Sequence, residues 1–241
     1  MTASREFADR VVLVTGVGRA GQIGNAVALA FGLAGARIVA CDLNAVGVVE
    51  RVREFAARGI DARPSAGNLT EPDIASLAVE TALRHYGRLD AVINVAGGLT
   101  TYGPLEKISV ADFDREMSIN VKTAFLVSQA AVGALAESRG AIVNFASIAL
   151  LHPAPAMVAY SAAKGAIAGL TQGLAAELAP RGIRVNAVAP SMVRTADNTA
   201  SSGTDANYVE MSEITDRILY LAGPASGTMT GQIVPITGSA A

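Results

Sequence analysis

The stretch RVVLVTGVGRAGQIG, residues 10–24, decides the predicted fold class. It begins with a short β-branched apolar run that ends in glycine, which predicts a buried strand. Gly16-x-Gly18-x-x-Gly21 follows at once and opens an alanine-rich helical segment. This order matches a dinucleotide-binding loop, in which the backbone approaches a pyrophosphate at the helix N-terminus. Because the chain contains 24 glycines, the motif alone is also compatible with an ordinary glycine-rich turn.

Strands and helices alternate along the rest of the chain. Predicted strands occupy residues 10–16, 36–42, 60–66, 89–97, 140–147, 183–190 and 232–236, and predicted helices occupy residues 25–33, 44–58, 70–86, 110–137 and 156–179. This alternation implies right-handed βαβ crossovers. It predicts an α/β fold: a single-domain, Rossmann-type, doubly wound parallel sheet of about seven strands with helices on both faces, over residues 1–241. Residues 194–211, rich in Ser, Thr, Asn and Gly, are predicted to be irregular and to form a flexible substrate lid.

Composition restricts the class of partner. Hydrophobic residues make up 51% of the chain, as expected of a folded globular protein. The net charge of −2, without a basic stripe, argues against nucleic acid or an anionic membrane surface as partner. Apolar runs such as residues 26–36 are shorter than the roughly 18–20 residues of a membrane span, and the N-terminus lacks a signal-peptide core. The single cysteine, Cys41, excludes an intramolecular disulfide, so we expect a cytoplasmic protein that acts on a small molecule.

Two charged residues bear on the choice of nucleotide. Asp42 ends the second predicted strand, 18 residues after Gly24. A carboxylate roughly 20 residues after the glycine motif can reach the adenosine ribose hydroxyls, and it would repel a 2′-phosphate. Asp42 therefore favours NAD(H). Arg19 argues for NADP(H), because a guanidinium in this loop can pair with a 2′-phosphate.

The helical segment VAYSAAKGAIAGL, residues 158–170, contains a second group of chemically useful residues. Tyr160 and Lys164 are four residues apart and so lie on one helix face. A nearby ammonium favours phenolate, which would lower the tyrosine pKa from about 10 and allow acid–base chemistry near neutral pH. Ser147 follows the fifth predicted strand, at the edge where parallel strands bind ligands. Asn120, within a predicted helix, can hold a water or bond a backbone carbonyl.

The set as a whole resembles the classical short-chain dehydrogenase/reductases over nearly the whole chain. The nucleotide loop, NVAG (residues 94–97), Asn120, Ser147, YSAAK (residues 160–164) and VNAVAP (residues 185–190) occur in that family's order and spacing. The resemblance implies that Tyr160 exchanges a proton with the substrate oxygen, which Ser147 polarises. It further implies that Lys164 holds the nicotinamide ribose and lowers the Tyr160 pKa, while Asn120 holds a water that links Lys164 to solvent.

The resemblance also implies the cofactor, its contacts and the assembly. The catalytic residues would be Asn120, Ser147, Tyr160 and Lys164, and the cofactor would be bound by Gly16, Arg19, Gln22, Ile23, Gly24, Asp42, Leu43, Asn68, Leu69, Asn94, Ala96, Gly97, Tyr160, Lys164, Pro190, Val193 and Thr195. NAD(H) is favoured, NADP(H) is the alternative, and no metal takes part. Family members commonly form homotetramers through the long helices, here residues 110–137 and 156–179, and through the C-terminal strand.

Four departures from the family pattern bear on these roles. The nucleotide loop is two residues longer than usual, and Gln22 stands where the central glycine would fall. Asn68 replaces the aspartate usually found near the adenine, although its amide can still bond an adenine amino group. Ser191 replaces the glycine that usually follows Pro190. The lid is shorter than typical, which predicts an open or partly disordered substrate pocket.

These observations support one main functional hypothesis and two alternatives. The main hypothesis is an NAD(H)-dependent oxidoreductase that transfers a hydride between the nicotinamide and a secondary alcohol or ketone, with Tyr160 as general acid and base. The alternative within the enzymes is an NADPH-dependent 3-oxoacyl-thioester reductase, which Arg19 favours and Asp42 opposes. The alternative from another class is a non-catalytic dinucleotide-sensing protein, because a fold does not guarantee a function.

Overall fold

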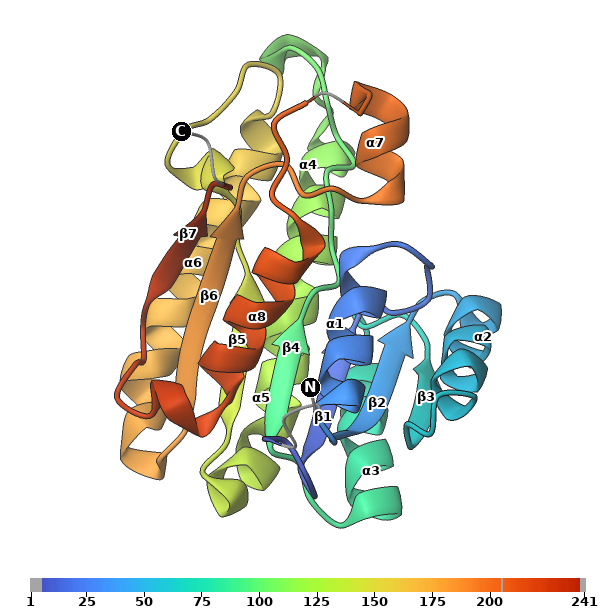
Figure 1. Ribbon diagram of the computed structural model, residues 1–241. Coiled ribbons are helices and arrows are strands. Elements are labelled where there is room, and N and C mark those ends of the chain that lie inside the picture. The colour runs from blue at the N-terminus through green and yellow to red at the C-terminus, as the bar shows by residue number, and fades with distance from the viewer. Residues whose placement is uncertain (1–5, 205, 239–241) are drawn as a thin grey trace.

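One parallel sheet organises the molecule (Figure 1). The computed structural model describes residues 6–204 and 206–238, and within these the strands are β1 (Val11–Thr15), β2 (Arg37–Asp42), β3 (Ala62–Ala66), β4 (Ala91–Asn94), β5 (Ala141–Phe145), β6 (Arg184–Pro190) and β7 (Ile233–Ile236). Their order across the sheet is β3-β2-β1-β4-β5-β6-β7, and every neighbouring pair is parallel. The order reverses between β1 and β4, which opens a crevice at the carboxyl ends of these strands. The predicted Rossmann-type fold is confirmed.

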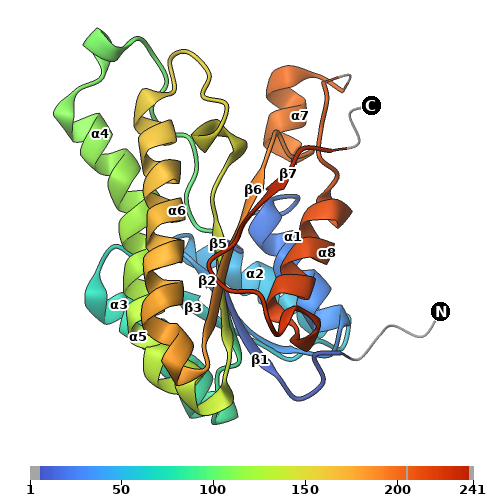
Figure 2. The same ribbon diagram turned by 90° about the vertical axis from the view of Figure 1, so that its left-hand side faces the viewer.

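Helices cover both faces of the sheet (Figure 2). The helices are α1 (Ile23–Leu33), α2 (Ala45–Ala56), α3 (Pro72–Tyr86), α4 (Val110–Met117), α5 (Thr123–Ser138), α6 (Val158–Leu178), α7 (Ala196–Ser202) and α8 (Met211–Ala222). One apolar core joins the sheet to α1, α2 and α8, and a second joins the opposite face to α3, α5 and α6. Because both faces are buried, the strands are apolar on both sides, as β1 shows by being buried throughout.

Local sequence signals explain several helix ends. Asn44 caps α2 through its side chain, which accepts a hydrogen bond from the Gly47 backbone N–H. Pro72 occupies the first turn of α3, and Gly87 ends that helix in the left-handed conformation. These ends are where the sequence predicts them.

The helix predicted over residues 110–137 is interrupted. A π turn, η2 (Ser118–Lys122), separates α4 from α5. The Asn120 amide in this turn donates to the carbonyl oxygens of Glu116 and Gly98, and so ties the widened turn to the loop after β4. Single π turns inside α-helices are frequent at functional sites. By length and composition alone the joined segment Val110–Ser138 could cross a membrane, but here it packs against β4 and, as Figure 2 shows, against α3 and α6.

The chain after β6 differs most from the prediction. Residues 194–211, expected to be irregular, contain α7, and a bridge between Val193 and Val209 closes the base of the segment. The helix α8 was not predicted at all. Its signals were a capping box, in which Glu210 and Glu213 bond each other's backbone, and an apolar face that includes Ile214 and Ile218.

Candidate functional site

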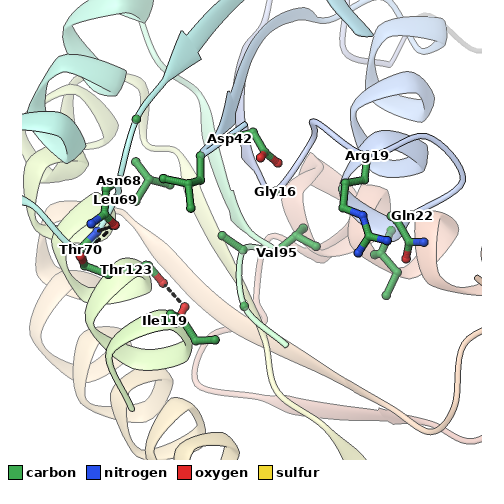
Figure 3. A pocket seen from close by; sticks show the side chains of 16 residues that line it. Gly16, Arg19, Gln22, Asp42, Asn68, Leu69, Thr70, Val95, Ile119 and Thr123 are labelled. Carbon is green, nitrogen blue, oxygen red and sulfur yellow. Dashed lines mark hydrogen bonds between the residues drawn. The ribbon is translucent and has the colours of Figure 1, made fainter. Parts of the chain in front are cut away.

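A cavity of about 330 Å³ opens at the crevice between β1 and β4 (Figure 3). Its walls come from the loop after β1, the ends of β2, β3 and β4, and the π turn. The lining residues are Gly16, Arg19, Gln22, Ile23, Gly24, Asp42, Leu43, Gly67, Asn68, Leu69, Thr70, Val95, Ala96, Gly97, Ile119 and Thr123. Arg19 and Gln22 lie on one side of it, and Asn68, Leu69 and Thr70 on the other (Figure 3).

The loop after β1 leaves room for a phosphate group. Gly16 has a φ of 77°, which a residue with a side chain rarely adopts, and a Cβ there would lie 3.2 Å from the Ala96 backbone. A Cβ on Gly24 would lie 2.6 Å from the Gly16 carbonyl carbon. Gln22 is the N-cap of α1, its side chain caps no N–H, and the first turn contains no acidic residue. Unoccupied N–H groups therefore face the cavity with the positive end of the helix dipole, which fits the pyrophosphate of a dinucleotide.

Asp42 is fixed at the rim of this cavity. Its carboxylate accepts hydrogen bonds from the backbone N–H groups of Gly18, at 2.7 Å, and Asn44, at 2.8 Å. A Cβ on Gly18 would lie 2.7 Å from the carboxyl carbon of Asp42, so glycine permits this approach. Each carboxylate oxygen keeps a further lone pair. Asp42 can therefore accept hydrogen bonds from ribose hydroxyls without losing its own support.

Arg19 extends toward α7. Its Nη2 lies 2.6 Å from an Oδ of Asp197 in α7, and both side chains are more than half exposed. The backbone N–H of Ala196 donates to the Gly21 carbonyl at 3.4 Å. The lengthened loop, whose conformation the sequence left undefined, thus meets the N-terminus of α7.

At the opposite side of the cavity, the Asn68 side chain forms hydrogen bonds with the residues just before α3. Its Oδ1 accepts hydrogen bonds from the Thr70 backbone N–H, at 3.1 Å, and from the Thr70 hydroxyl, at 2.8 Å. Its Nδ2 donates to Glu71. An adenine amino group would have to share Oδ1 with Thr70, whereas Leu69, which is buried, offers an apolar wall.

Asn94, a predicted cofactor contact, does not line the cavity. Its side chain points into the core, where Nδ2 donates to Ser128 at 3.1 Å and to Asn144 at 2.8 Å, and Asn144 in turn donates to Thr171. That Asn94 binds the cofactor stays a prediction, because its side chain faces the core and not the cavity. β5 and α5 supply hydrogen-bond acceptors for Nδ2, whereas the buried Oδ1 has no hydrogen-bond partner among the described residues. Val95 takes the place in the cavity wall.

Tyr160 and Lys164 lie in the first turns of α6, as predicted. The Lys164 Nζ is 5.5 Å from the centre of the Tyr160 ring and donates to the Phe145 carbonyl at 2.8 Å. Ser147 follows β5 and caps the short helix η3 (Ile148–Leu150), accepting from Ala149.

The two ionisable groups are both shaped by burial. Burial raises the pKa of Tyr160, hydrogen bonding to Ser147 opposes this, and the charge of Glu116 adds to the rise. The expected lowering of the Tyr160 pKa by Lys164 is therefore absent in the chain alone, because desolvation dominates. Burial also lowers the pKa of Lys164 to about 8, against the opposing effect of Glu116.

Asn120 is buried and fully engaged as a donor. Its Nδ2 bonds the carbonyls of Gly98 and Glu116 and the Glu116 carboxylate, and its Oδ1 accepts from the Gly98 N–H at 3.1 Å. Of the two roles that the sequence allowed for this amide, bonding to backbone carbonyls is the one observed. η2 packs against α6, so the π turn that contains Asn120 connects the cavity wall to the helix of Tyr160 and Lys164.

The remaining predicted contacts stand at the end of β6. Pro190 is the last residue of that strand, Val193 forms the bridge to Val209, and Thr195 caps α7 by accepting from Asn198. They do not line the cavity, but they lie where residues 194–211 leave the sheet. Sequence reasoning missed five lining residues, namely Gly67, Thr70, Val95, Ile119 and Thr123. Four of these five are direct neighbours in the chain of residues that it named, and Thr123 is one helical turn from Asn120, so adjacency was the available signal.

Comparisons with known proteins agree with this geometry. A family model described as short chain dehydrogenase matches residues 10–206. The chain is 34% identical over 241 residues to (2S)-[(R)-hydroxy(phenyl)methyl]succinyl-CoA dehydrogenase subunit BbsD of Thauera aromatica, with 95% of this chain and 96% of that protein covered. A 3-oxoacyl-[acyl-carrier protein] reductase with bound NAD from Brucella melitensis is 30% identical, with a TM-score of 0.88 over 98% of this chain and 93% of that one. NAD+-bound xylitol dehydrogenase is 31% identical, with a TM-score of 0.88 over 97% and 99%.

Proposed function

We propose a specific reaction for this chain, which belongs to the short-chain dehydrogenase/reductase family and is an NAD(P)-dependent oxidoreductase. It transfers a hydride between NAD(H) and a secondary alcohol or ketone. Tyr160 acts as the general acid and base. The observation that carries the proposal is the grouping of Ser147, Tyr160 and Lys164 beside the π turn that lines the glycine-loop cavity.

Each residue has a distinct task in this proposal. Ser147 donates a hydrogen bond to the substrate oxygen, and Tyr160 gives that oxygen a proton in reduction or takes it in oxidation. When bound, the nicotinamide supplies or accepts the hydride at the substrate carbon. Lys164 binds the ribose next to that ring and places a positive charge near the Tyr160 phenol, which favours phenolate. Asn120 holds the π turn in place.

Two contacts support NAD(H) over NADP(H). Asp42 presents a fixed carboxylate at the rim, where a 2′-phosphate would meet negative charge. Arg19, the residue that favoured NADP(H), already pairs with Asp197. A 2′-phosphate would have to compete with Asp197 for the guanidinium.

The test compares the wild-type chain with Tyr160→Phe. We expect the wild type to bind NADH more tightly than NADPH and to turn over members of an alcohol and ketone panel. The phenylalanine variant should bind NADH equally well and lose kcat by about 10²-fold or more, because it cannot transfer the proton. Near-normal turnover by the variant would refute the acid–base role, and tight NADH binding without any turnover would favour the dinucleotide-sensing alternative.

The second candidate is a 3-oxoacyl-thioester reductase, since one of the similar solved structures carries that name together with bound NAD. It shares the chemistry of Tyr160 and Ser147 and differs in the substrate. A strong preference for NADPH and for a 3-oxoacyl thioester over simple ketones would favour it.

The proposal extends to the assembly, the lid and the location of the protein. A homotetramer is supported by exposed apolar side chains along α4 and α5, including Val110, Phe113 and Phe125. Residues 194–211 would move to admit substrate. The expected location is the cytoplasm. Light scattering that gives a monomer would contradict the tetramer, and recovery in the membrane fraction of cells would contradict the location.

A further inference from the structure

One cation and one carboxylate line the glycine-loop cavity among the residues that the structure describes, namely Arg19 and Asp42. The backbone N–H of Gly18, the residue just before Arg19, donates to the Asp42 carboxylate at 2.7 Å. The Arg19 side chain therefore starts one residue from the carboxylate that would bind the adenosine ribose, and a 2′-phosphate on that ribose would be within its reach. Discrimination between NAD(H) and NADP(H) thus depends on where the Arg19 guanidinium is held.

Asp197, in the first turn of α7, holds this guanidinium. The Arg19 Nη2 lies 2.8 Å from Oδ1 and 2.6 Å from Oδ2 of Asp197. In Figure 3 the Arg19 side chain lies beside Gln22 and points away from Asp42. Within the described part of the chain, no other ion pair includes Arg19. The cation that would recognise a 2′-phosphate is therefore already neutralised, by a residue 178 positions further along the chain.

A backbone contact next to the ion pair keeps its two partners together. The Ala196 N–H donates to the Gly21 carbonyl at 3.4 Å, and a Cβ on Gly21 would lie 3.4 Å from the Ala196 Cβ. The nucleotide loop and α7 therefore touch through backbone atoms as well as through charges. An exposed ion pair contributes little when its two side chains must first be ordered. Here the segments that carry Arg19 and Asp197 are already side by side, which favours the pair.

The helix that carries Asp197 is itself supported by the segment around it. The Asn198 side chain donates to the Val193 carbonyl at 2.8 Å. The hydroxyl of Tyr208, a buried residue, lies 2.9 Å from the Asn198 carbonyl oxygen and 2.7 Å from the Gly203 carbonyl oxygen. These bonds fix both ends of α7, so the Asp197 carboxylate has a defined place opposite the nucleotide loop.

We propose that Asp197 is a positioning residue for nucleotide selection: it holds the Arg19 guanidinium at α7 and so withholds it from a 2′-phosphate. NAD(H) carries no such phosphate and binds with the pair intact, whereas NADP(H) meets the Asp42 carboxylate and an arginine that is already neutralised. This role rests on the proposed function, because it requires a nucleotide whose ribose is bound at Asp42. Asp197 contacts no reacting atom and acts only through Arg19.

The test measures the dissociation constants of NADH and NADPH by fluorescence titration at a fixed ionic strength, and it needs no turnover. Asp197→Asn removes the charge and keeps the size of the side chain. The dissociation constant for NADPH should fall by about fivefold, the upper range for an exposed ion pair, while that for NADH should change by less than about twofold. An unchanged dissociation constant for NADPH in this variant would overturn the proposal.

Arg19→Gln completes a double-mutant cycle. Because Asp197 acts through Arg19, Asp197→Asn should leave the dissociation constant for NADPH unchanged in the Arg19→Gln background. An equal gain of affinity in that background would mean that Asp197 repels the phosphate directly, and it would overturn the positioning role.

Asp197→Glu tests whether the charge is what matters. It keeps the carboxylate, so the ratio of the NADPH to the NADH dissociation constant should stay at the wild-type value. A ratio as low as that of Asp197→Asn would contradict a role for the charge and would overturn the proposal.

Asp216→Asn is the matched control for net charge. Asp216 is exposed on α8 and takes part in none of the ion pairs of the described residues. Its replacement changes the net charge of the protein by the same amount as Asp197→Asn, so both dissociation constants should keep their wild-type values. A gain in NADPH affinity equal to that of Asp197→Asn would assign the effect to overall charge and overturn the proposal.

The results separate the role of Asp197 from the proposed reaction. If the wild type prefers NADH and Asp197→Asn keeps the same preference, the role of Asp197 alone is refuted. If NADPH affinity rises as expected but no alcohol or ketone is turned over, the role of Asp197 is supported and the proposed reaction is refuted. A wild type that binds NADPH more tightly than NADH, or binds neither, would overturn both.

Discussion

Gly24 is the residue of the nucleotide loop whose replacement has the most calculable effect. It is the second residue of α1, and a Cβ at this position would collide with the Gly16 carbonyl, lying 2.6 Å from its carbon and 3.1 Å from the Thr15 carbonyl oxygen. Both neighbours are backbone, so they cannot turn aside as a flexible side chain would. In Gly24→Ala the strand-to-helix turn must therefore move or remain strained.

The magnitude follows from where the strain appears. Overpacking of this kind costs about 1–3 kcal/mol, and the helix preference of alanine returns at most about 1 kcal/mol. If the loop stays in place, the strain lowers the free energy of unfolding. If the loop moves, the cavity loses its shape, and the same energy weakens NADH binding by about 5- to 150-fold.

The assay measures both quantities on the same variants. Urea denaturation gives the free energy of unfolding, and titration of NADH fluorescence gives the dissociation constant. Gly133→Ala in α5 is the control, because Gly133 is also helical but a Cβ there meets nothing within 4 Å. The free energy of unfolding of the control should rise by up to about 1 kcal/mol, and the control should bind NADH as tightly as the wild type. Light scattering checks that both variants keep the wild-type assembly.

A single result would refute this reasoning. If Gly24→Ala unfolded at the wild-type urea concentration and bound NADH with the wild-type dissociation constant, the loop would accommodate a Cβ without strain. If the wild type itself did not bind NADH, that result would count against the proposed cofactor. The steric effect of the Cβ would then be tested by the free energy of unfolding alone.

Four further outcomes are expected. Asp42→Asn should weaken NADH binding by about tenfold and reduce the ratio of kcat/KM for NADH to kcat/KM for NADPH, because the charge that binds the ribose and repels a 2′-phosphate is lost. An unchanged ratio would contradict this prediction. Burial raises the pKa of Cys41 to about 12, so a thiol reagent at pH 8 should label it only after unfolding, and fast labelling of the native chain would be inconsistent with that burial. Arg184→Met should lower the free energy of unfolding in urea by about 1–3 kcal/mol, because Arg184 donates hydrogen bonds to the carbonyls of Leu221, Ala222 and Gly223 at the end of α8. The affinity for NADH should stay the same. Asn44→Ala should lose about 1 kcal/mol with loss of the α2 cap, and an unchanged urea midpoint would show that the cap contributes nothing.

Predictions from the sequence succeeded where the signal was local. The strands of the sheet were recognisable because buried parallel strands are short apolar runs, as in β1 and β5. Asn44 and Gly87 marked helix ends because capping depends on a few adjacent residues. The helix α8 was missed although its capping box was local, because it directly follows a polar segment that predicts irregular structure.

The residues of the candidate site also differ in whether local sequence signals could identify them. Gly16, Gly24 and Asp42 could be named because the motif and its spacing are properties of one βαβ unit. The direction of the Asn94 side chain could not be predicted, because it is decided by Asn144, 50 residues away, and by Ser128, 34 residues away. The role of Arg19 was equally hidden, since its partner Asp197 is 178 residues further along.

The sequence by itself determined the alternation of strands and helices, the helix caps and the order of the reactive residues, because each depends on backbone preferences and on neighbours within a few positions. Only the tertiary structure decided the π turn at Asn120, the burial of Glu116 and the pairing of Arg19 with α7. Each of these depends on hydrogen bonds between segments that are distant in the chain, such as Asn120 with Gly98 and Glu116 with Thr100. A buried polar group must take its partner wherever the fold supplies one, and that partner becomes known only once the segments are packed.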